Sequence, residues 1–344
     1  SEAQTKLDEV AKDLWILVET FKQDQRVAKL ESYDLLRRVL EEQCEVVGEA
    51  KDQQVQVKPS KEISGDSLQN PSDPDAGYDG HKGSGYRTQS METYQEKKED
   101  DKNDVPPNLI TYAEVTPIHE RDEDAVASAL ESTAARGCQP KEVLMDAAYG
   151  SDENVQDAKK EGTEIIAPTK GESKKKDDML ILEDFTLDKE SGEVAACPAG
   201  KKPKRITVTG KDVHYAEFDL ETCQQCEFKD YCQVGRGEKG YRMVYTDKQM
   251  RLAQRRQQEA TEEFRDKYRW RAGVEATMSQ LKRVMKIGRL RYRGLGKVRL
   301  AVKMKCLGWN LFQAVRAIKA RILSKFQFLI FEMHRNIHID HSNV

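Results

Sequence analysis

The pattern of apolar positions changes from helical to strand-like near residue 85. In residues 5–49, apolar residues recur three and four positions apart, which predicts two amphipathic helices. Residues 50–84 are polar and rich in turn-forming residues. β-Branched and aromatic residues then predict strands at Tyr86–Thr93 and Leu109–Thr116, and prolines bound the second of them.

The next segment alternates helices with short apolar strands. A helix is expected from Asp122 to Ala135 and a strand at Val143–Met145. A second helix should begin after Ser151 as its N-cap and end at Gly162, before a strand at Glu164–Ile166. This alternation indicates an α/β fold with a mixed sheet flanked by helices.

The second half of the chain contains a cysteine-bearing segment followed by long helical patterns. The charged run at 171–178 interrupts the α/β pattern, and residues 180–246 are strand-like with few helix signals. Asp247–Met285 predicts one long helix, in which Gly273 is the only helix-breaking residue. The last expected elements are a strand and a helix, at 289–294 (RLRYRG) and Lys297–Lys325.

Length and composition allow a globular protein. The 344 residues correspond to roughly two domains. No stretch approaches the roughly 18 apolar residues of a membrane span, so no membrane association is expected. A basic and then apolar leader is missing, which argues against secretion and predicts a cytoplasmic protein. Because the chain starts at Ser1 on a helical pattern, we expect an N-terminally truncated fragment of a longer protein.

The net charge of −3 hides a strong asymmetry along the chain. Residues 264–325 contain 18 basic and 2 acidic residues, a net charge of +16, so the other 282 residues carry −19. Such a one-sided surface favours contacts with nucleic-acid phosphates over the alternative, a solvated helix face. The residues expected to bind DNA from this region are Lys282, Arg283, Lys286, Arg289, Arg291 and Arg293.

Four of the seven cysteines are clustered within 36 positions and two of these form a C-x-x-C. In a long chain without a leader, this clustering favours metal binding over disulfides. Four thiolates suit tetrahedral Zn²⁺ and leave no open position for catalysis, so a structural zinc is predicted. Free or redox-active thiols are the alternative. The expected ligands are Cys197, Cys223, Cys226 and Cys232.

Four polar residues of the long predicted helix share one face. Tyr268, Arg271, Glu275 and Lys282 fall within a sector of about 60° at 100° per residue. A carboxylate beside two cations and a hydroxyl can hold a divalent cation while its neighbours contact phosphate oxygens. The alternative is a solvated face with i,i+4 ion pairs, each worth about 0.3–0.5 kcal/mol.

Further acids lie near strand ends. Asp146 follows the strand at 143–145, where α/β sheets place ligands, although a single Asp there more often opens a turn. Glu92 lies at the end of the strand at 86–93, and Asp75 in an Asp-Pro-Asp turn is its rival. With Glu275, three acids from separate elements suit two divalent cations, about 3.5–4 Å apart, in phosphoryl transfer. Carboxylate ligands favour Mg²⁺ or Mn²⁺.

These segments resemble a known family. The pattern Y-x2-R-x3-E-x6-K in YRWRAGVEATMSQLK is similar to that of bacterial insertion-sequence transposases of the DDE type. SDPDAGYDGHKGSGYRTQSMET, MDAAYGSDEN and RLRYRGLGKVR also resemble blocks of that family, in its order, across roughly residues 70–320. The resemblance implies an RNase H-like domain in which Asp146 is the second acid and Glu275 the third. Relatives commonly carry Asp where this chain has Glu92, so Asp75 remains a rival for the first acid.

The resemblance also implies an activity. Such an enzyme cleaves the ends of a mobile element in double-stranded DNA and joins the 3′-hydroxyl to target DNA. Tyr268, Arg271 and Lys282 would hold the phosphates, and two element ends imply a homodimer in the DNA complex of a nucleoid-associated protein. Two rivals stay open: a catalytically inactive, transposase-derived DNA-binding protein, and a zinc-organised interaction module with no role in nucleic-acid binding.

The expected fold class is α/β, with an RNase H-like mixed sheet, a cysteine-containing β-rich insertion and a long C-terminal helical region. Five parts are predicted: 1–50 as a helical linker or remnant of an upstream DNA-binding region, 51–170 as the first part of the catalytic domain, 171–246 as the zinc-binding insertion, 247–325 as C-terminal helices with the basic DNA-binding surface, and 326–344 as a tail.

Overall fold

The computed structural model describes the backbone of residues 2–48, 53–95, 106–171, 179–188, 190–210, 212–236 and 240–340. Side chains are described for the same residues except 2–4 and 328–340. The charged run expected to interrupt the fold at 171–178 therefore lies outside the described residues, apart from Gly171. The chain divides into two compact units. Unit 1 comprises Ser1–Arg121 and Val274–Val344, and unit 2 comprises Asp122–Gly273.

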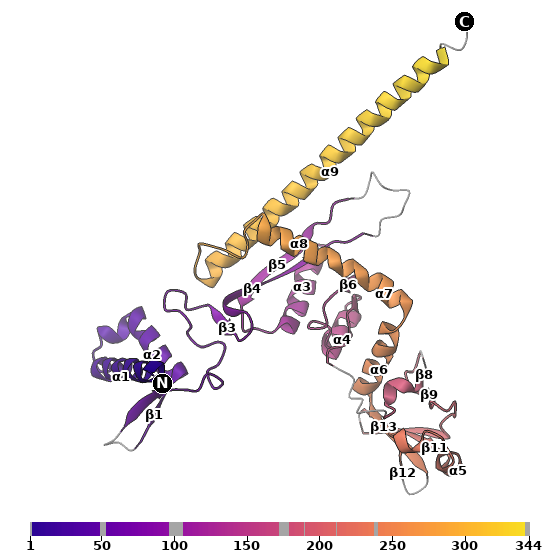
Figure 1. Ribbon diagram of the computed structural model, residues 1–344, viewed down its shortest axis with the longest axis horizontal. Helices are drawn as coiled ribbons and strands as arrows, with labels where there is room; N and C mark the ends of the chain where they lie inside the picture. The colour runs from indigo at the N-terminus through magenta and orange to yellow at the C-terminus, as the bar shows by residue number, and fades with distance from the viewer. Residues whose placement is uncertain are drawn as a thin grey trace. The chain divides into compact units, whose positions relative to one another are not determined.

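The N-terminal part of unit 1 is a helical hairpin with a small β-hairpin (Figure 1). Both predicted helices are present, and Tyr33 links them by donating a hydrogen bond to the carbonyl of Val18 over 2.8 Å. The buried face of the first helix packs on one side of the β-hairpin. Val18, Cys44 and Val55 belong to the core that the helix and the strands share. The elements are α1 (Glu2–Phe21), η1 (Val27–Lys29), α2 (Glu31–Gln43), β1 (Cys44–Val47) and β2 (Gln54–Val57).

A three-stranded antiparallel sheet and two helices form the main core of unit 1. Its order is β3-β4-β5, and α9 contacts β5. The side chain of Asn310 on α9 accepts from the N–H of Ile110 at 2.8 Å and donates to its carbonyl at 2.9 Å, which satisfies the edge of β5. The elements are β3 (Gly77–Asp79), β4 (Gly83–Glu92), β5 (Ile110–Pro117), α8 (Ala272–Arg283) and α9 (Leu295–Asp340).

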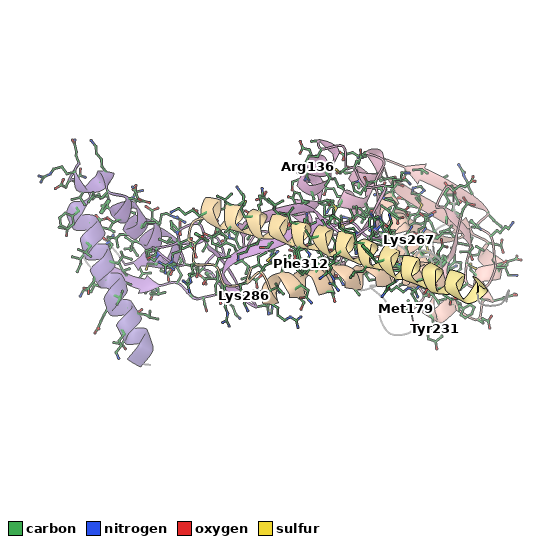
Figure 2. All side chains as sticks on the ribbon, turned by 90° about the horizontal axis from the view of Figure 1, so that it is seen from above. Arg136, Met179, Tyr231, Lys267, Lys286 and Phe312 are labelled. Carbon is green, nitrogen blue, oxygen red and sulfur yellow. The ribbon has the colours of Figure 1, made fainter. Side chains whose placement is uncertain are left out.

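Helix α9 is the long helix at the C-terminal end in Figure 1, and it continues past the expected end at Lys325 to Asp340. Its inner face is buried in the core through Val298, Val302, Cys306 and Trp309. Large apolar side chains on its other sides are exposed, including Phe312, which Figure 2 labels. Within the described residues, no helix is long and apolar enough to span a membrane.

Unit 2 begins with the helices and strands that the sequence predicted. β6 and β7 pair in parallel, and the connection between them contains α4. Ser151 caps α4 as expected, because its hydroxyl accepts from the N–H of Asn154 at 3.2 Å. The elements are η3 (Asp122–Asp124), α3 (Ala125–Ala134), β6 (Glu142–Leu144), α4 (Asp152–Lys160) and β7 (Glu164–Ile166).

The cysteine-bearing segment is rich in short strands, as predicted. Its main sheet has the order β10-β11-β13-β12, and its core contains Phe185, Val194 and Tyr245. The segment is called the insertion below and spans 179–246. Its elements are η4 (Leu182–Asp184), β8 (Thr186–Leu187), β9 (Val194–Ala196), β10 (Arg205–Thr209), β11 (Val213–Phe218), α5 (Leu220–Gln224), η5 (Lys229–Tyr231), β12 (Gly235–Arg236) and β13 (Tyr241–Thr246).

The prediction of one long helix over Asp247–Met285 is wrong, because the chain forms several shorter helices there. The break does not occur at Gly273 but at Thr261, whose hydroxyl accepts from the N–H of Phe264 at 3.3 Å and so starts a new helix. A 3-10 turn then separates two α-helices. The elements are α6 (Asp247–Glu259), α7 (Glu262–Tyr268), η6 (Arg269–Arg271) and α8.

Two other expectations also differ from the structure. The segment 289–294 forms bends and irregular backbone instead of the predicted strand. Its end is held by Asp73, whose carboxylate accepts from the N–H of Gly294 at 2.8 Å. The fold is mixed α/β, but its described strands form several small sheets, with β3-β4-β5 in unit 1 and β6-β7 in unit 2, instead of one mixed sheet.

Candidate active site

Asp146 in unit 2 lies in the turn after β6, at the carboxyl end of a parallel strand pair. Its Oδ1 accepts from the N–H of Ala147 at 2.7 Å, and its Oδ2 lies 2.9 Å from Nη2 of Arg271. The Asp146 side chain is 52% exposed. An ion pair this exposed contributes at most about 1 kcal/mol, so the carboxylate can exchange Arg271 for another cation at little cost.

Two aromatic rings accompany Arg271. Its guanidinium carbon lies 6.0 Å from the ring centroid of Tyr268, and that ring stacks on Phe264 at 5.5 Å. The 3-10 turn of residues 269–271 connects Tyr268 to Arg271. The structure thus brings together three of the predicted site residues, Tyr268, Arg271 and Asp146, although the last is 125 positions from Arg271 in the sequence. We call these three residues the Asp146 cluster.

Glu92 in unit 1 is the last residue of β4, next to an irregularity in the β4–β5 register between Met91 and Glu92. The side chain is partly buried and forms a hydrogen bond with the hydroxyl of Thr277 on α8. Burial raises the pKa of the Glu92 carboxyl, and the hydrogen bond from Thr277 opposes this shift in part. No local pattern predicts the contact between Glu92 and Thr277, since the two residues are far apart in the chain.

Glu275 lies on the exposed side of α8. It is about 200° around the helix from Thr277, so Glu92 contacts the packed side of α8 while Glu275 is on the other side. Met278 and the fully buried Leu281 continue the packed side. Lys282, seven positions after Glu275, shares the exposed side with it.

Asp75, the rival first acid, holds the start of α9. Its Oδ2 accepts from the N–H of Leu295 at 2.8 Å, and the neighbouring Asp73 accepts from Gly294. An acid at a helix N-terminus satisfies an otherwise unpaired N–H and interacts favourably with the helix dipole. Asp73 also accepts a hydrogen bond from the hydroxyl of Tyr86, and burial together with this bond raises the pKa of Tyr86. Sequence reasoning missed Asp73, because the N–H that it caps is 221 positions away.

The basic residues from Lys282 to Lys305 are of two kinds, exposed residues and residues engaged in contacts within unit 1. All six predicted DNA-binding residues from Lys282 to Arg293 are exposed, including Lys286, which Figure 2 labels. By contrast, Arg299 and Lys303 on α9 pair with Glu114, and Lys305 donates to the carbonyl of Met285. These last three basic residues therefore hold unit 1 together, and the part of the basic run open to a ligand is centred on residues 282–293.

The four predicted zinc ligands in the insertion line one cavity of about 30 Å³, which has room for a single ion or a water molecule. The turns at Cys197 and at Cys223–Cys226 are closed by backbone hydrogen bonds, from Gly200 to Cys197 and from Cys226 to Cys223. Burial and the nearby Cys197, Cys226 and Cys232 raise the pKa of Cys223 to about 11. The structure therefore gathers the four cysteines predicted from the sequence around one space.

The predicted ligand residues offer the types of atom that the expected metals bind. Asp146, Glu92 and Glu275 offer the hard oxygen atoms that Mg²⁺ prefers, and the cysteines offer the soft sulfur atoms that Zn²⁺ accepts. Among the described residues, however, no three His, Cys, Asp or Glu side chains are placed as a set around a metal position.

Comparison with known proteins gives one family match. Residues 196–315 match the family described as Transposase DDE domain. This segment contains the four clustered cysteines, the motif residues from Tyr268 to Lys282 and the exposed basic residues from Lys282 to Arg293. No curated protein and no solved structure matches the chain.

The raised pKa of Glu92 gives a test of its environment. Glu92→Gln should raise the thermal unfolding temperature at pH 7.5 in EDTA, because burial disfavours the carboxylate that the variant removes. The difference should shrink as the pH falls below the pKa of an unfolded Glu, about 4.3, because Glu92 is then protonated in both the folded and the unfolded state. Glu131→Gln, at an exposed position of α3, is the control and should show no such pH-dependent gain. An equal or lower unfolding temperature for Glu92→Gln at pH 7.5 would contradict the burial of this carboxyl.

Proposed function

We propose that the chain is the catalytic region of a DNA transposase. It would cleave the ends of a mobile element by attack of water on a phosphodiester and then join the free 3′-hydroxyl to target DNA. The observation that carries the proposal is the contact between Arg271 of the YRWRAGVEATMSQLK motif and Asp146 after β6. The match of residues 196–315 to the DDE transposase family supports it independently.

In this proposal the catalytic acids are Glu92, Asp146 and Glu275. The hydrogen bond of Asp75 to the start of α9 favours Glu92 over Asp75 as the first acid, because Asp75 already has a structural role. When bound to these acids, two Mg²⁺ or Mn²⁺ ions would activate the attacking oxygen and stabilise the leaving oxygen. An RNase H-like arrangement of the acids is part of the proposal.

The cations of the motif would hold the DNA phosphates. Arg271 offers several N–H donors in a planar group, a geometry that suits phosphate oxygens. Tyr268 would contribute its hydroxyl, and Lys282 a charge on the exposed side of α8 shared with Glu275. Together these groups would hold the reacting phosphodiester close to the acids while one of its phosphorus–oxygen bonds breaks and another forms.

The exposed basic residues from 282 to 293 would bind the double-stranded DNA that flanks the cleaved bond. Their exposure leaves them accessible to phosphates, which contribute most of the sequence-independent affinity of DNA-binding proteins. A reaction on two element ends requires two active sites, so we propose a homodimer in the DNA complex.

The insertion would contain one structural Zn²⁺ bound by Cys197, Cys223, Cys226 and Cys232. The common cavity supports this proposal, since four cysteines line it and Zn²⁺ takes four ligands. The ion would crosslink the turn at Cys197 to the segment 223–232, and the role would be structural because no ligand position stays open.

One observation favours a second candidate, a catalytically inactive DNA-binding protein derived from a transposase. Glu92 contacts the packed side of α8, whereas Glu275 lies on its exposed side. If this separation persists on DNA, the acids do not share a metal. DNA binding would then remain without cleavage.

The two candidates differ in strand cleavage. With Mn²⁺ and a linear duplex that carries the ends of the element encoding the protein, Asp146→Asn and Glu275→Gln should each reduce cleavage and joining by more than about 100-fold, because each removes a proposed metal ligand. Glu131→Gln, on the exposed side of α3, is the matched control and should retain full activity.

Wild-type activity in both acid variants would refute the assignment of these acids. Inactivity of the wild type itself, with DNA binding intact, would instead establish the inactive candidate.

DNA affinity should fall steeply with salt concentration if residues 282–293 bind phosphates. The triple variant Lys286→Gln, Arg289→Gln, Arg291→Gln should reduce the slope of log affinity against log salt by about 3, or about 1 for each lost phosphate contact. The matched control removes three exposed basic residues outside this region and outside residues 1–50, in Lys61→Gln, Lys141→Gln, Lys159→Gln. An unchanged slope in the first variant would exclude these residues from the DNA contact.

Metal content tests the zinc proposal. Native mass spectrometry of protein purified in a reducing buffer should find one Zn²⁺ per chain, and Cys226→Ser should lose it. Cys138→Ser, at an exposed cysteine outside the cavity, should keep the ion. Metal-free wild-type protein that takes up no added Zn²⁺ would show that the four cysteines only pack the core.

A further inference from the structure

Helix α6 contacts two parts of unit 2 with two different faces. Residues 251, 255 and 259 are spaced by four positions and so lie on one face, which contacts the segment 150–169. Residues 253 and 257 belong to the other face, which contacts the insertion. α6 thus connects the cysteine-bearing insertion to the segment that follows Asp146.

The first face makes hydrogen bonds to both ends of the segment 150–169. Arg251 forms a bidentate pair with the buried Asp152 at the start of α4, with a shortest distance of 2.7 Å. Arg255 donates to the carbonyls of Gly150 and Ala167, at 3.0 and 3.1 Å. Beyond them, Glu259 accepts from the N–H and the hydroxyl of Thr169.

The second face is part of the core of the insertion. Ala253 is 1% exposed and packs among the residues of that core, and Met250 lies against it. Gln257 donates to the carbonyls of Glu183 and Phe185, at 2.9 and 2.8 Å. Rotation or displacement of α6 would therefore break contacts on both sides at once.

Arg255 is the closest of these contacts to Asp146. The turn from Asp146 to Gly150 is closed by hydrogen bonds from Tyr149 to the Asp146 carbonyl, at 3.0 Å, and from Gly150 to the Ala147 carbonyl, at 3.2 Å. Arg255 holds the last carbonyl of this turn. The approach is close, since a Cβ on Gly150 would lie 2.8 Å from the Cβ of Ala167 and 3.2 Å from Nη2 of Arg255.

We propose that Arg255 is a positioning residue, which fixes the Asp146 turn against α6, and that the insertion acts through α6 as the support of this turn. Arg255 itself touches neither DNA nor the reacting atoms in this proposal. Its guanidinium joins the end of the turn to the end of β7, so the position of the Asp146 carboxylate depends on a helix that the insertion core holds in place. The proposal rests on the catalytic role of Asp146 stated above.

Hydrogen exchange of the full chain, measured by mass spectrometry, tests the positioning role without using activity. Arg255→Gln should accelerate exchange of the Tyr149 and Gly150 amides by about tenfold or more, because two hydrogen bonds to the turn and to β7 are lost. The matched control Lys248→Gln removes an exposed charge from the same helix and should leave this exchange unchanged. Exchange in β11 and β13 should stay unchanged in both variants, which shows that the insertion remains folded.

The role of the insertion is tested by Gln257→Ala, which removes the two hydrogen bonds on the other face of α6. Faster exchange at Tyr149 and Gly150 in this variant supports the coupling. Unchanged exchange there, with faster exchange around Phe185, would overturn the support by the insertion.

Strand cleavage gives the second measurement. Arg255→Gln should raise the Mn²⁺ concentration for half-maximal cleavage by about tenfold while DNA affinity stays at the wild-type value, and Arg255→Lys should restore part of the loss. If the wild type cleaves DNA and Arg255→Gln equals Lys248→Gln in both measurements, the positioning role is wrong and the transposase proposal stands. If the wild type is inactive, the exchange measurement still decides the positioning role and the transposase proposal fails separately.

Discussion

The packing of α9 against β5 is the interaction on which unit 1 depends. An antiparallel sheet of three strands is stable only if one face is covered, and here the cover comes from α8 and α9. Val115 is completely buried by this contact, and Asn310 satisfies both backbone groups of Ile110. The same packing fixes the position of α8, and therefore which sides of it face Glu92 and solvent. The two proposed acids of unit 1 are thus arranged by an apolar contact that contains no catalytic group.

In unit 2 the proposed catalytic acid, Asp146, is positioned by polar contacts instead. Its two parallel strands are short, and the turn that contains Asp146 is held from outside by α6 through charged side chains bound to backbone carbonyls. Charged groups that donate to carbonyls fix direction as well as distance, which a purely apolar contact does less well. Arg271, the last residue of the 3-10 turn at 269–271, contacts the Asp146 carboxylate as well. The exposed carboxylate therefore has a fixed backbone and an exchangeable charge partner.

The sequence predicted correctly those elements whose signals lie within a few residues of each other in the chain. Strand alternation and the cap at Ser151 located β4 to β7 and α4, and the cysteine spacing identified the four residues that line one cavity. The motif also predicted Arg271 as a site residue, and the strand end at 143–145 predicted Asp146. The new helix start at Thr261 was missed, because neither glycine nor proline marks it. The capping of α9 by Asp73 and Asp75, and the contact of Glu92 with Thr277, depend on partners far along the chain, which periodicity cannot identify.

The order of the chain has a consequence for biosynthesis. Unit 1 contains both ends of the sequence, and unit 2 is encoded between them. The asparagine that pairs with Ile110 is translated 200 residues after it. At elongation rates of about 5–20 residues per second, the apolar face of β5 therefore stays uncovered for about 10–40 s, while unit 2 can already fold. Nascent chains of this protein thus pass through a stage in which one half is finished and the other exposes Val115 and its neighbours to chaperones or to other nascent chains.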